Sequence, residues 1–77
     1  MDVDKLVRMA NQIAANLDYG SDKEKIAAAA ADHLKRFWTP SMLAAVIEGH
    51  RNKLLDLTPI AARAVEKLAE QKHNAAR

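Results

Sequence analysis

The apolar residues of the chain recur at alternating spacings of three and four, which places side chains along one face of an α-helix. The first such stretch runs from Val3 to Leu17, with Asp2 as its expected N-cap. It stops before Gly20, which can supply the positive φ that commonly ends a helix. Read along the whole chain, the pattern predicts four helices, roughly over residues 3–17, 22–38, 40–53 and 59–70.

The starts of the later helices carry capping signals. Ser21 and Glu24 have the spacing of a capping box, in which a hydroxyl and a carboxylate satisfy each other's backbone amides. Thr39-Pro40 and Thr58-Pro59 each place an N-cap residue before a proline, whose fixed φ suits the first helical position. These signals separate the second, third and fourth predicted helices.

The second predicted helix has one apolar face, and its last residues are the most informative. Its apolar face is made by Ile26, Ala30, His33, Leu34 and Phe37. Phe37 is therefore assigned to the core. Trp38 lies one position off this face, so we expect it either to cover the end of the bundle or to protrude toward a partner. The alanines at 27–31 let a neighbouring helix approach closely.

Four helices joined by short turns indicate an all-α fold, a compact bundle forming a single small domain over residues 1–77. The connector at 54–57 contains three leucines and is more apolar than an ordinary loop. Gly49 weakens the third helix by up to about 1 kcal/mol relative to alanine. The apolar pattern fades after Glu70, so we expect a frayed C-terminal tail over 71–77.

Composition adds that the core is small. Of the 77 residues 49% are hydrophobic, but 16 residues are alanine, which favours helices strongly and removes little surface from water. A chain of this length buries only about 60% of its unfolded surface. We therefore expect a partner to supply part of its stability.

Charge and cysteine content exclude several classes of protein. Twelve Lys and Arg against ten Asp and Glu give a net charge of +2, too slight for the basic footprint of a nucleic-acid-binding protein. The chain has no cysteine, hence no disulfide and no thiolate ligand, which favours a reducing compartment. It shows neither a secretory signal nor a membrane-spanning apolar run. We predict a cytoplasmic protein without membrane contact.

Candidate chemistry is sparse. No two of His33, His50 and His73 have the three- or four-residue spacing that aims two imidazoles at one metal ion. Gly20 and Gly49 are too few for a phosphate-binding loop. We predict no catalytic residue, metal site, bound cofactor or small-molecule substrate. His33 and His50 fall on apolar faces, which indicates partly buried histidines bonded across helices or, alternatively, interface contacts; His73 is expected to be a solvated tail residue.

Two of the predicted helices, 22–38 and 40–53, have the layout of a helix-turn-helix DNA-binding unit. The second of them opens with Pro40-Ser41-Met42-Leu43-Ala44-Ala45. It therefore has no Arg, Lys, Asn or Gln in its first turns, where a recognition helix contacts bases. A small nucleic-acid-binding regulatory module is kept as the alternative function.

The segment 31–42 carries more surface groups than a turn requires. Tryptophan and arginine are enriched among interface hot spots, and methionine packs adaptably. We predict a partner interface here, made by Arg36, Trp38, Pro40, Met42 and His33. A homo-oligomer that uses the same apolar surface is a further possibility.

The run Ala31-Asp32-His33-Leu34-Lys35-Arg36-Phe37-Trp38-Thr39-Pro40-Ser41-Met42 resembles the central signature of the delta subunit of soluble NAD-dependent, molybdenum-containing formate dehydrogenases. Residues 6–13 look like the opening motif of that family, and Leu57-Thr58-Pro59-Ile60 with Ala64 is similar to its closing element. The chain departs from the family at 14–17, where aromatics are frequent, and at Ser41 and Leu43, which flank Met42 where basic residues are frequent.

The resemblance implies a non-catalytic accessory subunit of a cytoplasmic complex that oxidises formate and reduces NAD⁺. Its implied partner is the catalytic (alpha) subunit, which holds the molybdenum bis-pterin guanine dinucleotide and iron-sulfur clusters, while FMN lies on another subunit. The implied role is to support assembly, maturation or stability of the complex.

Overall fold

The computed structural model describes residues 2–18, 20 and 22–75, with side-chain surroundings given through Gln71. These residues form four helices and no strand: α1 (Val3–Asn16), α2 (Lys23–Phe37), α3 (Pro40–Arg51) and α4 (Pro59–Ala75). The predicted all-α bundle is confirmed.

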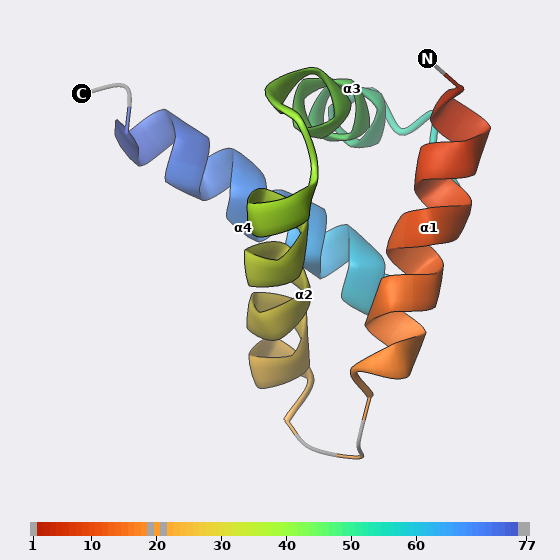
Figure 1. The fold of residues 1–77 in the computed structure, drawn as a ribbon, viewed down its shortest axis with the longest axis vertical. Coiled ribbons are helices and arrows are strands. Elements are labelled where there is room, and N and C mark those ends of the chain that lie inside the picture. Colours follow the sequence, from red (N-terminus) through yellow and green to blue (C-terminus); the bar gives the residue numbers. More distant parts are fainter. Residues whose placement is uncertain (1, 19, 21, 76–77) are drawn as a thin grey trace.

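The helices pack in a crossed arrangement (Figure 1). α1 and α2 flank the view from top to bottom, α4 begins beside α1 and crosses behind α2, and α3 lies across the top. α2 packs most extensively against α4, and α1 contacts each of the other three helices. The Cα radius of gyration, 11.4 Å, matches the value of about 11.5 Å for a globular domain of this length.

Small residues dominate the buried surfaces of α2 and α4. Ala27, Ala30 and Ala31 on α2 and Ala61 and Ala64 on α4 are each no more than 1% exposed. Alanine lets helix backbones approach closely, which agrees with the role predicted for the alanine run. The larger side chains that are fully buried are Leu34, Val46 and Val65.

Three of the predicted caps are confirmed. The carboxylate of Asp2 accepts a hydrogen bond from the Lys5 amide at 3.3 Å, and the hydroxyl of Thr39 accepts from the Met42 amide at 3.2 Å. The hydroxyl of Thr58 accepts from the amide three residues later at 3.3 Å. Pro40 and Pro59 each follow the cap at the first helical position.

The capping box predicted for the second helix is not the observed cap. Asp22 is the N-cap, and its carboxylate accepts from the Glu24 amide at 2.9 Å. Because the helix begins at Lys23, Glu24 occupies the second helical position instead of the third that a capping box requires. Ser21 lies outside the described residues. The Glu24 side chain is thereby left to reach another helix.

The turn after α1 and the end of α4 can also be compared with the predictions. Gly20 has the expected positive φ of 80°. The predicted end of the last helix at 70 is wrong, since α4 continues to Ala75. Residues 71–75 contain neither glycine nor proline, so the backbone hydrogen bonds continue although the apolar pattern fades. The side chain of His73 lies outside the described part of the structure.

Candidate partner interface

The predicted interface segment spans the end of α2, a two-residue turn and the first turn of α3. Trp38 lies in this turn, where its extended backbone ends α2 and its N–H donates to the Leu34 carbonyl at 2.8 Å. Its side chain is only 6% exposed and belongs to the core cluster. Of the two arrangements expected for Trp38, the structure contains the one that covers the end of the bundle.

Phe37, unlike Trp38, has an exposed side chain, so the prediction that it is a core residue is wrong. It is 71% exposed. The buried face of α2 follows Ala27, Ala31, Leu34 and Trp38, with spacings of four, three and four. This face includes Trp38 and turns Phe37 to its flank. The predicted face shares Ile26, Ala30 and Leu34 with the buried surface, but it continues to His33 and Phe37, which lie on the flank of that surface.

The exposed end of α2 carries an aromatic pair beside an ion pair. The rings of His33 and Phe37 have centroids 4.7 Å apart at an interplanar angle of 42°. Arg36 pairs with Asp32 through its Nε at 3.1 Å, and both side chains are more than half exposed. Half-buried His33 therefore supports an exposed ring, and Arg36 is held one turn from Asp32.

The remaining predicted residues divide between surface and core. Pro40 is exposed, whereas Met42 is half-buried and packs against the core cluster. The structure thus leaves Arg36 and Pro40 at the surface and places Trp38 and Met42 mainly in the core. The inclusion of these residues in an interface stays a prediction.

A groove next to this segment was not predicted. It has a volume of about 300 Å³, and its apolar lining consists of Pro40, Leu43, Ala44, Ile47 and Leu68, with Lys35 and Gln71 completing it. Leu43 and Ile47 are four residues apart on α3, a spacing that places both side chains on one face of the helix. Exposed Ala44 is too small to cover the space beside them. This alanine is the one feature of the sequence that could have indicated a groove here.

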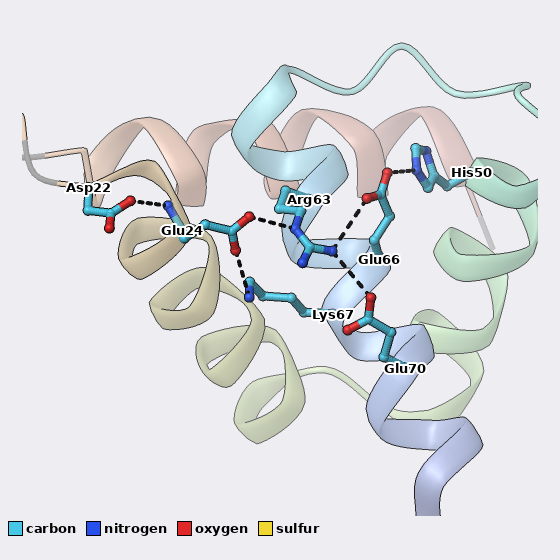
Figure 2. Close-up of polar contacts among 7 residues, drawn as sticks. All are labelled: Asp22, Glu24, His50, Arg63, Glu66, Lys67 and Glu70. Carbon is cyan, nitrogen blue, oxygen red and sulfur yellow. Dashed lines mark hydrogen bonds and ion pairs between the residues drawn. The ribbon is translucent and has the colours of Figure 1, made fainter.

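A network of ion pairs joins α2 to α4 (Figure 2). Glu24 accepts from Arg63 Nε at 2.9 Å and from Lys67 Nζ at 2.8 Å. These hydrogen bonds, first that of Lys67 and then that of Arg63, lower the pKa of Glu24 below its ordinary value of 4.5. Glu24 and then Glu70 raise the pKa of Arg63. Arg63 and Lys67 are half-buried and Glu24 is exposed, and each of the three charges has a partner of opposite sign, as expected for a contact that joins two helices.

The same network continues to α3. Arg63 lies 3.6 Å from Glu66, whose other carboxylate oxygen is 3.0 Å from Nε2 of His50. The side chain of His50 is 26% exposed. This confirms the prediction of a partly buried histidine that hydrogen-bonds between helices.

The described residues contain no cluster of three or more His, Asp or Glu side chains placed to hold one metal ion. Within the same part of the chain, none of the helices has both the length and the apolar content needed to cross a membrane.

The fold defines a small all-α domain whose polar contacts serve helix packing. The chain belongs to a family within this class: residues 5–65 match the model of the NADH-dependent formate dehydrogenase delta subunit FdsD. Neither a search of curated proteins nor a search of solved structures returned a match.

Proposed function

We propose that this chain is a non-catalytic accessory subunit of a cytoplasmic NAD-dependent formate dehydrogenase, and that it binds the molybdenum-containing catalytic subunit. The observation that carries this proposal is the family match over residues 5–65 of a 77-residue chain. The match gives the delta-subunit family; the binding partner and the role in assembly are the proposal.

The residues of the chain support a role without a cofactor of its own. The chain has no cysteine, so it offers no thiolate to an iron-sulfur cluster. The carboxylates of Glu24 and Glu66 are engaged in ion pairs that join helices. We propose that molybdenum bis-pterin guanine dinucleotide, iron-sulfur clusters and FMN are held by other subunits of the complex, as the family resemblance implies.

The test is to delete the gene for this chain in its native organism and to purify formate dehydrogenase through a tag on the catalytic subunit. We expect less assembled complex, or complex with a lower molybdenum content per catalytic subunit, and recovery on re-expression of the chain. In the parent strain, the chain should co-purify with that subunit. Unchanged yield and molybdenum content, together with no co-purification, would refute the proposal.

The alternative, a nucleic-acid-binding module, makes a different prediction in a gel-shift series. Binding through phosphate contacts weakens steeply as salt rises. The structure offers little for such contacts at the start of α3, where Met42 and Leu43 are half-buried and pack against the core. We expect no salt-sensitive shift with duplex DNA or RNA.

A further inference from the structure

The groove of about 300 Å³ beside the predicted interface has an apolar floor and a more exposed wall. Ile47 and Leu68, from α3 and α4, are buried at 8% and 5% exposure and form the floor. Half-buried Leu43 and exposed Pro40 and Ala44 line the side that belongs to α3. An apolar surface of this kind remains wet until another apolar group covers it, and covering it is favourable.

The described lining of this groove carries a single positive charge. Lys35 at the end of α2 is the one charged side chain among the described residues that line it. Lys35 forms no ion pair with any other described residue, while its neighbour Arg36 is paired with Asp32. Glu66 and Glu70 of α4 line a neighbouring pocket, which shares Ile47 with this groove. An occupant that brings a carboxylate to the rim beside Lys35 would therefore face no acidic side chain in the described lining of the groove.

The size of the groove selects the class of occupant. Pockets that bind small molecules or cofactors have volumes of about 300–1,000 Å³. This groove lies at the lower limit of that range and is open to solvent. It suits one or two large side chains of a protein segment better than a nucleotide-sized cofactor.

We propose that this groove docks a segment of the catalytic subunit of formate dehydrogenase that presents a large apolar side chain next to a carboxylate. The apolar side chain covers Ile47 and Leu68, and the carboxylate pairs with Lys35. This inference rests on the proposed function and adds to it the docking surface and the chemistry of the segment that is bound.

Two substitutions at exposed positions test the groove without removing core contacts. Ala44→Glu places a carboxylate in the apolar lining, and Lys35→Glu reverses the charge of the rim. The matched controls are Ala29→Glu and Lys25→Glu, which make the same changes at exposed positions of α2 outside the groove lining. Circular dichroism of each full-length variant checks that it is folded.

The measurement is equilibrium binding of each variant to the purified catalytic subunit from the same organism, at low and high salt. We expect Ala44→Glu to bind at least about tenfold more weakly, because a carboxylate must be desolvated in the groove. Lys35→Glu should bind about two- to fivefold more weakly at low salt, with a smaller difference at high salt. Both controls should bind as wild type does.

The other outcomes distinguish the groove from the proposed function. If wild type binds and both groove variants bind equally well, the groove assignment is wrong and the proposed function stands. If sedimentation of the chain alone shows a dimer that Ala44→Glu abolishes, the occupant is a second copy, which also overturns the assignment. If wild type does not bind the catalytic subunit, the proposed function fails and this inference fails with it.

Discussion

Asn11 on α1 holds Thr58, the N-cap of α4, although the two residues are 47 positions apart in the chain: the Asn11 side-chain oxygen accepts a hydrogen bond from the Thr58 N–H at 2.9 Å. The amide nitrogen of the same side chain donates to the Asp56 carbonyl at 3.2 Å. Asn11 belongs to the opening motif and Thr58 to the closing element described above. The two motifs therefore meet in space, and this contact fixes the start of α4 against α1.

Replacing Asn11 tests this contact. Asn11→Ala removes both hydrogen bonds, each of which contributes about 1 kcal/mol net, so we expect a loss of about 1–2 kcal/mol in the free energy of unfolding. Urea denaturation followed by circular dichroism measures it. The control is Gln12→Ala, whose side chain bonds to Asn16 within α1 and whose loss should cost less than about 0.5 kcal/mol. Equal effects at the two positions would contradict a specific role for Asn11.

Trp38 and Phe37 are adjacent residues with opposite expected effects. Truncating a buried tryptophan costs about 3–5 kcal/mol, close to the whole stability of a small domain. We expect Trp38→Ala to lose most of its helical circular dichroism, and Phe37→Ala to keep its helical signal and lose less than about 1 kcal/mol. Thermal unfolding of the isolated chains decides between them. A folded Trp38→Ala would show that its side chain is dispensable for the core.

The burial of Trp38 limits what a substitution at this position can show about an interface. With the side chain 6% exposed, a loss of co-purification in Trp38→Ala would report unfolding as readily as a lost contact. Arg36 and Pro40, which are exposed, are the predicted interface residues whose substitution can report on binding alone.

The parts of the fold that depend on local chemistry were predictable from the sequence. Asp2, Thr39 and Thr58 act on amides three residues away, so the sequence alone locates these helix starts. The end of the buried face of α2 was not predictable, because Phe37 and Trp38 both continue a helical spacing from Leu34 and only tertiary packing decides which one is covered. The contact between Asn11 and Thr58 needs α1 and α4 to be placed first, which no local pattern provides.

The candidate interface was also predictable only where it depends on local sequence. Its location at the end of α2 came from residue types that interfaces favour, such as Arg36 and Trp38, and those types do not report exposure. The groove lined by Ala44 and Leu68 lies between α3 and α4, so its existence depends on how these two helices pack. Periodicity assigns residues to faces but cannot show where a small residue leaves space between them.

Glu24 gives the structure an acid-sensitive contact. The folded state lowers the pKa of Glu24 below 4.5 through hydrogen bonds from Lys67 and Arg63. Its contribution to stability is therefore fully present above the unfolded-state pKa and is lost as the pH falls through the lower folded-state value. Because Glu24 is exposed, solvent screening keeps this contribution small.

The expected measurement is a shift of the urea midpoint between pH 6 and pH 3, about the range over which carboxylates titrate. Wild type should lose more stability over this range than Glu24→Gln, which cannot ionise and keeps a side chain of similar size. Glu48→Gln is the control, since the ion pair of Glu48 with Arg51 spans 3.9 Å within α3. Parallel pH profiles for wild type and Glu24→Gln would contradict the role of the Glu24 contacts in acid sensitivity.

Gly49 is in the interior of α3, where glycine is unfavourable, and the structure supplies the reason for its presence. A Cβ added there would lie 2.8 Å from Cγ of Leu55 and 2.9–3.0 Å from its two methyl carbons. Leu55 packs against the core cluster, and its branching carbon is among the clashing atoms, so rotating the end of the side chain cannot clear the clash. The glycine therefore lets the connector after α3 fold back onto that helix.

Two opposing terms set the effect of Gly49→Ala. Higher helix propensity favours alanine by about 1 kcal/mol, and overpacking against Leu55 costs about 1–3 kcal/mol. We expect a net loss of about 1 kcal/mol in the free energy of unfolding, measured by urea denaturation. In a Leu55→Ala background the clash is gone, so Gly49→Ala should instead stabilise the protein by up to about 1 kcal/mol. The same effect of Gly49→Ala in both backgrounds would show that the close approach of Leu55 is not what requires glycine at this position.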